Sequence, residues 1–262
     1  MDVPVLHRIV VYPIKALDGV ALPAARIGPA GGLAGDREFA VLGPGDRVVN
    51  GKREARVHAI RADYDLGARL VRLRADGASA PREATFHLDQ DRAGLEAWLT
   101  AFFGYGVRLL HDGRRGFPDD SRYFGPTVVS TPTLAAVAAW FPGLTLDSAR
   151  RRFRPNLELD AAEPFWEDRL IGADAPVPFC IGQVRFEGME PWPRCAVPTR
   201  DPRTGAGDPS FQQTFSAYRR AHLPAWAPRE RFDHFYRLCV GTRVPASEAG
   251  KLVRVGDPVT LP

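Results

Sequence analysis

The stretch VLHRIVVYPI (5–14) decides how the first half of this chain is expected to fold. It is rich in β-branched residues and partly alternates apolar with polar side chains, which is typical of a β-strand. The following KALDG (15–19) ends in a turn signal, so the strand should stop near Lys15. A lysine in that position can hold an anion, although it can equally be a solvated strand-end residue.

More short strands are expected further along the first half. They recur at intervals of about a dozen residues, which is typical of a barrel or a sandwich. The segments that show this character are PAARIG (23–28), REFAVLG (37–43), RLVRLRA (69–75), ATFHL (84–88) and GVRLLHD (106–112). Arg37 lies where the second of these strands begins, beside Asp36, and a surface ion pair between the two would need no function.

One amphipathic helix is expected in the first half, over residues 91–104. Its apolar side chains recur three and four residues apart, Asp89 or Asp91 can cap its start, and Gly104 stands where a helix end is expected. The polar, aperiodic segment 113–126 then separates two halves. We therefore expect one domain over residues 1–115 and a second over residues 125–262.

The second half is again rich in strands. A short strand at 127–130 should lead into a helix capped by Ser130 or Thr131, and another helix is expected within 208–222. Further strands are expected at 156–160, 177–190 and 251–261, the last as a hairpin about its VGD turn, while 230–240 fits either helix or strand. The predicted fold class is a β-rich α+β protein: a barrel-like N-terminal domain and a second β-barrel domain with a few helices.

Composition excludes several classes of protein. The chain has 262 residues, 45% of them hydrophobic and 25% charged, so it can bury a large core. Its three cysteines are far apart without a CxxC pair, which argues against a disulfide framework or a zinc knuckle. No signal-peptide pattern and no apolar run of about 20 residues is present. We expect a soluble, cytoplasmic protein without a membrane span.

The arginine-rich segment SARRRFRPNLELD (148–160) is a candidate anion site. Pro155 disfavours helix at the preceding residue, so the segment is expected to be extended there. Arg152 and Arg154 would then point to the same side and could converge on one anion. A solvated face or a nucleic-acid patch is the alternative, but aromatic side chains are not interleaved with the run as a stacking platform would require, and no nucleic-acid partner is expected.

The segment PWPRCAVPTRDPRTG (191–205) holds the cysteine with the least ordinary surroundings. Prolines stiffen the backbone about Cys195, and Arg194 places positive charge beside the sulfur, which favours the thiolate that binds soft metals or attacks electrophiles. Burial as a small apolar residue is the alternative, and it is the expected state of Cys180 and Cys239. No P-loop, GxSxG or HExxH motif occurs in the chain.

Taken in order, these segments resemble one family. VVYPIKALDG followed by GLAGDREFAVL resembles the N-terminal β-barrel domain that precedes a MOSC domain, and RFRPNLEL, PWPRC with TRDPRTG, and the closing VRVGDPVTL resemble the MOSC domain itself. The resemblance spans nearly the whole chain. The layout is similar to that of the amidoxime-reducing molybdenum enzymes, and it implies a molybdenum cofactor, Mo-molybdopterin, bound between the two halves.

The resemblance also implies roles for individual residues. Cys195 would be the metal ligand and the catalytic residue, and Lys15 and Arg37 would hold the phosphate and pterin from the first half. The remaining cofactor-binding candidates are Ser130, Arg152, Arg154, Asn156 and Arg194. One departure is Ala16, which stands where the family often has a serine, so one hydroxyl contact to the cofactor is expected to be missing.

The activity implied is reduction of a small N-hydroxylated or N-oxide substrate, N–OH to N–H, with release of water. Electrons would come from a separate ferredoxin- or cytochrome b5-like donor protein with its reductase. A non-redox carrier of sulfur or of molybdenum cofactor on Cys195 is the alternative. The sequence identifies no general acid; Asp201 is a candidate for that role and equally a candidate turn residue.

Overall fold

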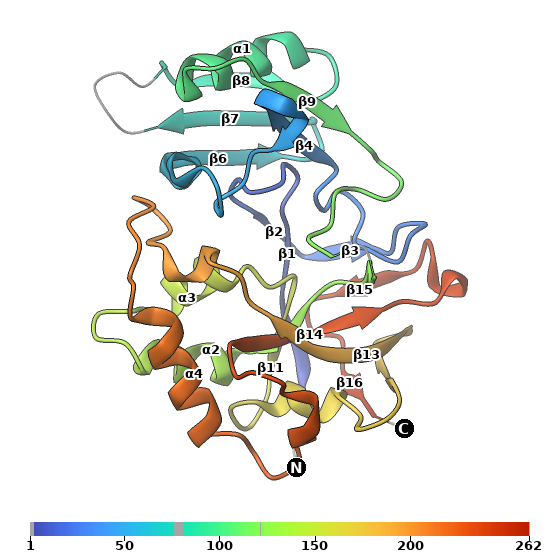
Figure 1. Ribbon diagram of the computed structural model, residues 1–262. Helices are drawn as coiled ribbons and strands as arrows, with labels where there is room; N and C mark the ends of the chain where they lie inside the picture. The colour runs from blue at the N-terminus through green and yellow to red at the C-terminus, as the bar shows by residue number, and fades with distance from the viewer. Residues whose placement is uncertain (1–2, 76–80, 121, 262) are drawn as a thin grey trace.

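The computed structural model describes residues 3–75, 81–120 and 122–261, so the outermost residues of the two expected domains, 1 and 262, lie outside it. Two bodies stack end to end (Figure 1). Among the described residues, the upper body carries one α-helix and two small sheets, and the lower body carries a large sheet, a two-stranded sheet and three α-helices. The chain crosses between the bodies more than once, and these crossings place the site.

The upper body is built from two antiparallel three-stranded sheets, ordered β5-β4-β9 and β6-β7-β8. Their apolar faces close on a core together with one face of helix α1. The elements are β4 (Phe39–Gly43), β5 (Arg47–Val48), β6 (Ile60–Asp65), β7 (Leu70–Ala75), β8 (Ala84–His87), α1 (Arg92–Phe103) and β9 (Arg108–His111).

Helix α1 confirms the amphipathic pattern read from the sequence. Asp91 accepts a hydrogen bond from the backbone N–H of Gly94, and Gly104 ends the helix with φ 71°. Leu95 and Leu99 are fully buried and belong to the upper core. The cap, the glycine and the apolar face each act locally, which is why this helix could be predicted from its own residues.

The lower body is organised by an eight-stranded sheet, ordered β16-β12-β13-β14-β10-β11-β1-β2. Its neighbours pair antiparallel except for β10 and β11, which are parallel. A separate pair joins β15 to β3. The strands are β1 (Val5–Val11), β2 (Val20–Leu22), β3 (Ala24–Arg26), β10 (Val128–Ser130), β11 (Leu157–Asp160), β12 (Val177–Ile181), β13 (Val184–Pro193), β14 (Arg237–Arg243), β15 (Leu252–Arg254) and β16 (Val259–Thr260).

The first three strands lie in the sheets of the lower body. Strand β1 pairs with β11, and β3 pairs with β15, so residues 5–26 contribute to a layer formed mostly by the second half. A boundary near residue 115 therefore does not divide the chain into two separate hydrogen-bonded units. The consequence is that the segment following β1, which contains Lys15, emerges from the lower sheet directly beneath the upper body.

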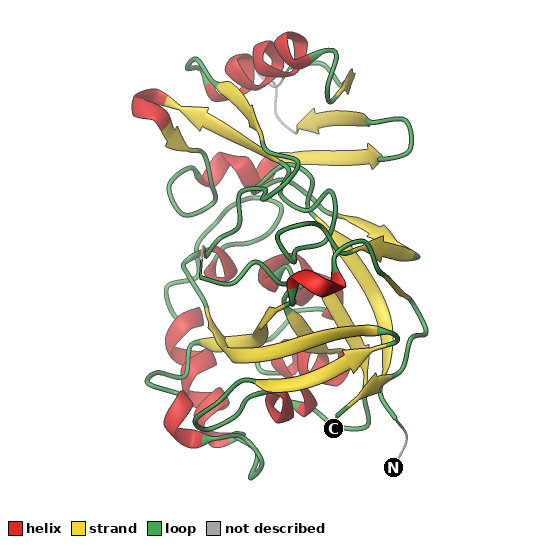
Figure 2. Ribbon diagram, turned by 90° about the vertical axis from the view of Figure 1, so that its right-hand side faces the viewer, coloured by secondary structure: helices red, strands yellow, loops and turns green. Residues whose placement is uncertain are grey.

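Three helices gather on one side of the lower sheet (Figures 1 and 2): α2 (Thr131–Ala139), α3 (Leu146–Phe153) and α4 (Phe211–Ala221). They share a core that includes Leu134, Phe153 and Phe215. Ser130 caps α2 by accepting a hydrogen bond from the N–H of Thr133, as its position before Pro132 predicts. The helices expected after residue 130 and within 208–222 are confirmed.

Three local predictions differ from the structure. The arginine run is not extended: residues 146–153 form α3, which ends at Arg154 with φ 49°. Segment 251–261 is not a hairpin, because β15 pairs with β3 and β16 pairs with β12. Segment 177–190, expected as one strand, contains the β12–β13 hairpin about Gly182. In the first two cases packing or pairing with distant segments decides the conformation, whereas the β12–β13 hairpin is local and turns at Gly182.

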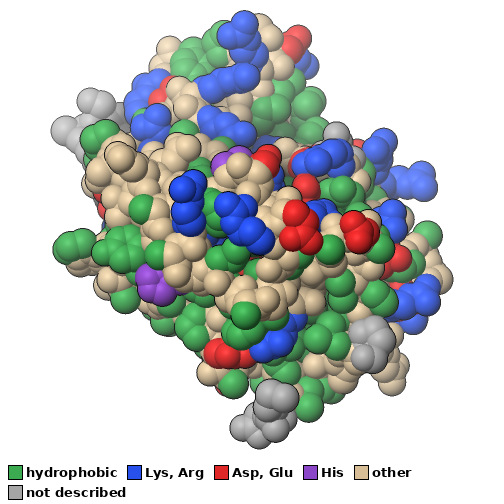
Figure 3. Space-filling model, turned by 60° about the horizontal axis from the view of Figure 1, so that its bottom comes forward, with side chains coloured by type: hydrophobic (Ala, Val, Ile, Leu, Met, Phe, Trp, Pro, Cys, Tyr) green, Lys and Arg blue, Asp and Glu red, His purple; other side chains and the backbone are tan. Residues whose placement is uncertain are grey.

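The fold class is the β-rich α+β class that the sequence predicts. On the face drawn in Figure 3, basic and acidic side chains lie intermixed. Among the described residues, no helix is both long enough and apolar enough to cross a bilayer.

Candidate functional site

A cavity of about 660 Å³ lies where the two bodies meet. Its walls come from both halves of the chain. The first half contributes β1 with the segment after it, the turn at Arg37, and segment 48–63. The rest comes from residues between 119 and 127, helix α3 with the strand that follows, and the end of β13 with its loop. Of the eight residues implied by the sequence, seven line this cavity: Lys15, Arg37, Arg152, Arg154, Asn156, Arg194 and Cys195. The eighth, Ser130, does not line it.

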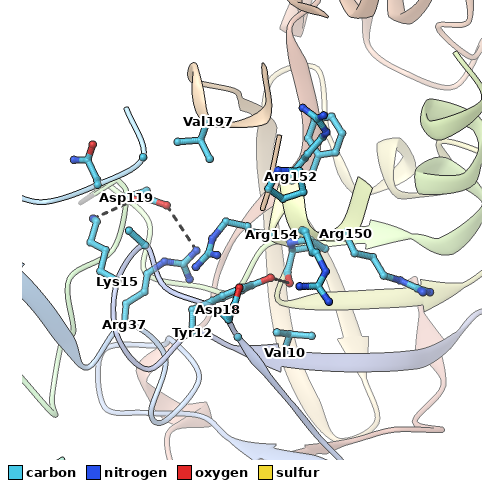
Figure 4. A pocket seen from close by; sticks show the side chains of 18 of the residues that line it. Val10, Tyr12, Lys15, Asp18, Arg37, Asp119, Arg150, Arg152, Arg154 and Val197 are labelled. Atoms are coloured by element: carbon cyan, nitrogen blue, oxygen red, sulfur yellow. Dashed lines mark hydrogen bonds and ion pairs between the residues drawn. The ribbon is translucent and has the colours of Figure 1, made fainter. Parts of the chain in front are cut away.

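Lys15 and Arg37 approach the cavity from neighbouring turns. The N–H of Lys15 donates to the carbonyl of Phe39, and the N–H of Arg37 donates to the carbonyl of Tyr12, so each turn fixes the other. Lys15 Nζ lies 3.1 Å from one carboxylate oxygen of Asp119, and an Arg37 nitrogen lies 3.7 Å from the other (Figure 4). Two cations from the first half therefore meet at one point.

The carboxylate of Asp119 is held between these cations. Loss of hydration among the surrounding side chains opposes its charge, although the side chain is still 57% exposed, but Arg37, Lys15 and Arg154 together keep the pKa of Asp119 below its usual range. For Arg37, burial likewise opposes the charge, and Asp36 and Asp119 outweigh it and raise the pKa of the guanidinium. Asp119 thus stays ionised and marks the position where the site favours an anion.

Arg154 reaches this cluster from the second half. One of its guanidinium nitrogens donates to the carbonyl of Leu17 at 2.6 Å, and the group lies 4.0 Å from the centre of the Tyr12 ring. Arg37 lies over the same ring at 5.2 Å. The expected convergence of Arg152 and Arg154 from an extended run is therefore wrong: Arg154 alone points here, because it ends helix α3 in a left-handed conformation.

Arg152 points to a different part of the cavity. It lies in the last turn of α3, and one guanidinium nitrogen donates to the carbonyls of Pro198 and Arg200, at 2.8 and 2.7 Å. It therefore braces the loop that carries Cys195. The other two arginines of the run form ion pairs, Arg150 with Glu158 and Arg151 with Asp147.

Cys195 lies at the cavity wall on the loop that follows β13. Its side chain is partly exposed, and its sulfur accepts a hydrogen bond from the N–H of Val197 at 3.5 Å. The N–H of Arg194 donates to the carbonyl of Tyr236, and its guanidinium donates to the carbonyl of Phe153. The loop is therefore fixed on both sides of the sulfur, and the thiol is not part of the apolar core.

Three backbone conformations at this site are uncommon for residues with a side chain. Ala16, Arg37 and Arg154 have φ of 74°, 51° and 49°. Each such conformation costs about 1–3 kcal/mol and persists only where the surroundings enforce it. All three residues line the same cavity, which is typical of a functional site.

Ser130 and Asn156 have structural partners. Ser130 is fully buried, and its hydroxyl bonds with Thr133 at the start of α2, so the expectation that it touches a cofactor does not fit its position. The side chain of Asn156 accepts from the N–H of Thr127 and donates to the carbonyl of Val10. Asn156 faces the cavity, but its side chain already links Thr127, just before β10, to Val10 in β1.

Asp201 is a turn residue. One of its carboxylate oxygens accepts from the N–H groups of Arg203 and Thr204, at 2.9 and 2.8 Å. It is not among the residues that line the cavity. Burial opposes the charge of Asp201, and those backbone N–H groups hold its pKa below the usual range. The geometry therefore gives it no role as a proton donor.

Sequence reasoning missed His58, Tyr12 and Asp119 as parts of the cavity wall. His58 lies in the 3₁₀ turn Ala55–Ala59, against Gly51. Burial, followed by the nearby charges of Arg154, Arg200 and Arg61, lowers the pKa of His58 to about 4, so its ring is neutral at physiological pH. No local pattern marks this histidine. Tyr12 stands beside the predicted Lys15, and Asp119 lies in a segment interpreted only as a linker.

The described wall of this cavity offers the sulfur of Cys195 and several cations rather than a complete set of metal ligands. Within residues 3–75, 81–120 and 122–261, no group of three or more His, Cys, Asp or Glu side chains is placed to hold a metal ion. A metal at Cys195 would thus have to arrive with further ligands of its own.

Comparison with known proteins adds two findings. Residues 3–107 match the family model of the MOSC N-terminal beta barrel domain, and residues 124–260 match that of the MOSC domain. Among curated proteins, mitochondrial amidoxime reducing component 2 of Bos taurus is 25% identical over 282 residues, covering 95% of this chain and 80% of the relative.

Proposed function

Because this chain belongs to the MOSC-domain family, with an N-terminal beta barrel domain before the MOSC domain, we propose that it is a molybdenum-cofactor-dependent oxidoreductase that reduces N-hydroxylated compounds. The observation that carries the proposal is the meeting of Lys15, Arg37, Arg154 and Cys195 in one cavity. The name of the bovine relative, an amidoxime reducing component, supports the choice of substrate class.

The residues of the cavity suit a phosphorylated, sulfur-rich metal cofactor. Three cations surround one carboxylate, and a phosphate would satisfy the same cations with stronger, charge-assisted hydrogen bonds. Among the described residues, the buried Nε atoms of Arg152 and Arg194 lack a hydrogen-bond partner, so two donors near the Cys195 loop remain for a ligand. A thiolate is a suitable ligand for a soft metal centre.

Each residue would then have a separate task. Lys15, Arg37 and Arg154 would neutralise and orient the phosphate, and the sulfur of Cys195 would bind the metal. When bound, the cofactor would supply the two-electron chemistry that removes oxygen from an N–OH group. Binding and orientation are the contributions of the protein in such enzymes.

The wall beside Cys195 would shape the substrate position. Gly51, His58 and Val197 lie against one another there, and a Cβ atom on Gly51 would come within 2.5 Å of the His58 ring. The neutral ring of His58 could exchange a hydrogen bond with an uncharged substrate. We further propose that electrons come from a separate donor protein of the ferredoxin or cytochrome b5 type.

The test is metal and pterin analysis of the wild-type protein beside Cys195→Ser, with Cys180→Ser as the control from a strand outside the cavity. We expect molybdenum and pterin in the wild type and in Cys180→Ser, together with reduction of an amidoxime by a chemically reduced donor. Cys195→Ser should lose most of both. Equal molybdenum content and equal activity in all three proteins would remove Cys195 as the ligand.

A carrier role for Cys195 is the second candidate. It is favoured by the partly exposed sulfur, which accepts a hydrogen bond from a backbone N–H and could hold a sulfane sulfur as a persulfide. Intact-mass analysis separates the two functions. An added sulfur atom on Cys195 in a protein without molybdenum would support the carrier, whereas molybdenum with pterin supports the reductase.

A further inference from the structure

Residues 112–120, which precede the second half, are attached to Lys15 and Arg37, called here the cation pair. Lys15 Nζ donates to the carbonyls of Phe117 and Pro118, at 2.9 and 2.7 Å, as well as pairing with Asp119. The N–H of Phe117 donates to the carbonyl of Arg37 at 2.8 Å. One lysine therefore binds three consecutive residues of this segment, and the last of the three is an acid.

The carboxylate of Asp119 bridges the two cations as an inorganic anion would. One oxygen faces Lys15 and the other faces Arg37 (Figure 4). The two cationic side chains are only 14% and 13% exposed, whereas the side chain of Asp119 is 57% exposed. The cations are thus fixed parts of the wall, and the anion between them is the part that solvent can reach and replace.

The charge balance supports exchange rather than permanent pairing. Arg37 already has a second carboxylate, Asp36, and Lys15 keeps two carbonyl partners without Asp119. Arg154, from the second half of the chain, acts on Asp119 through space. A phosphate group carries more charge and more acceptor oxygens than a carboxylate, so it can engage all three cations at once.

We propose that Asp119 is an internal counter-ion that occupies the phosphate position when no ligand is bound and leaves it when a phosphate-bearing ligand enters. The proposed function is used here only for the identity of that ligand. Asp119 would lower the affinity for phosphate by competition, and its departure would free one contact of segment 112–120 from Lys15. The device would stabilise the site before a ligand binds, because Asp119 is the carboxylate that pairs with Lys15 there.

Titration of inorganic phosphate into the cofactor-free protein, followed by calorimetry, tests the competition directly. Asp119→Asn removes the competing charge and keeps the side-chain shape, so it should bind phosphate about two- to fivefold more tightly than the wild type, as the loss of one exposed ion pair allows. The matched control is Asp120→Asn on the same segment, because Asp120 pairs with Arg122 at 2.7 Å rather than with the cation pair. Its affinity should equal that of the wild type.

A double variant assigns the gain to this position. Asp119→Asn with Lys15→Met should bind phosphate more weakly than Asp119→Asn alone. Equal or weaker phosphate binding by Asp119→Asn than by the wild type would overturn the inference, as would a gain that persists without Lys15. If neither the wild type nor Asp119→Asn binds phosphate, the inference is also overturned, since the position would then not accept this anion.

A second measurement uses the unmutated protein and does not depend on the fold of a variant. Arg114 and Arg115 are exposed on the same segment, so trypsin can report its release. Cleavage there should accelerate when phosphate is added, with sodium chloride at equal ionic strength as the control; an unchanged or slower rate contradicts the inference. Molybdenum analysis is independent of both readouts. If Asp119→Asn binds phosphate more tightly but the wild-type protein contains no molybdenum, only the proposed reductase is refuted.

Discussion

The guanidinium group of Arg154 lies over the ring of Tyr12, 4.0 Å from its centre. The contact joins the end of α3 to the segment after β1, and the Tyr12 hydroxyl donates to the carbonyl of Pro155 at 3.1 Å. Burial raises the pKa of Tyr12 to about 12, although Arg154 and Arg37 oppose the shift, so the hydroxyl keeps its proton. A neutral tyrosine therefore connects the two arginines of the anion site.

Arg154→Lys should separate charge from shape at this site. Lysine keeps the positive charge but loses the planar group that both lies on Tyr12 and reaches the carbonyl of Leu17. We expect about 1–2 kcal/mol less stability, because a buried cation–π contact and a hydrogen bond are lost, and a clear fall in molybdenum content. Chemical unfolding and metal analysis measure the two effects.

The control for that variant is Arg243→Lys, which makes the same change in an exposed arginine paired with Glu187. It should change neither measurement appreciably. Full molybdenum retention by Arg154→Lys, with stability equal to that of Arg243→Lys, would show that the guanidinium plane of Arg154 is not needed.

Ser130→Ala tests the position that the structure assigns to Ser130. The hydroxyl caps α2 and bonds with Thr133, so its removal should cost about 0.5–2 kcal/mol of stability. The molybdenum content should stay at the wild-type level, because Ser130 is not among the residues that line the cavity. The control is Thr145→Ala, which removes the corresponding cap of α3 and should lose a similar amount of stability as Ser130→Ala. A selective loss of molybdenum in Ser130→Ala would contradict the assignment.

The fold could be predicted wherever the deciding interactions are local. Helix α1 contains its own cap, apolar face and terminal glycine, and the N-cap residue Ser130 likewise predicts the start of α2. The run at 148–160 shows the opposite case. Pro155 predicts an extended residue before it, but Arg154 is left-handed instead, and the packing of Phe153 against α4 favours a helix up to Phe153.

The site could be predicted mainly because its segments resemble the MOSC family. That resemblance implies roles for Lys15, Arg37, Arg154 and Cys195, and all four line the cavity. The residue patterns alone leave each of them open between a functional and a structural role. Asp119 and His58 could not be found in this way, because their importance comes mainly from residues about 35 to 140 positions distant in the chain. Ser130 was assigned by resemblance, and its local capping signal, also present in the sequence, describes its position better.

Ala16→Ser should improve cofactor binding. Ala16 lines the cavity beside Lys15, and a hydroxyl there would add one hydrogen-bonding group to the anion site. Ala16→Gly is the backbone control, since the residue has φ 74° and glycine adopts that conformation without strain. We expect higher molybdenum content in Ala16→Ser alone, and stability within about 1 kcal/mol of wild type in both. An equal gain in Ala16→Gly would assign the effect to the backbone.

A buried acidic pair below the site gives the protein a pH-dependent stability. Glu167 and Asp168 are adjacent and almost fully buried, and Asp168 pairs with the buried Arg219. Burial, followed by the charge of Asp168, raises the pKa of Glu167. Its carboxyl group accepts hydrogen bonds from the N–H of Ser130 and the hydroxyl of Thr133, but these do not offset the cost of burying the charge.

The wild type should therefore lose stability as the pH rises, and Glu167→Gln should not show this loss. Because the folded state holds the Glu167 proton more tightly than the unfolded state, the contribution is present at low pH and lost as pH rises above the usual glutamate pKa. Glutamine mimics the protonated form, so the variant should gain stability relative to wild type with increasing pH. Urea unfolding from pH 5 to 8 measures the difference, with Glu163→Gln as the control because the Glu163 side chain is 42% exposed. A constant difference between Glu167→Gln and wild type across that range would show that Glu167 does not titrate there.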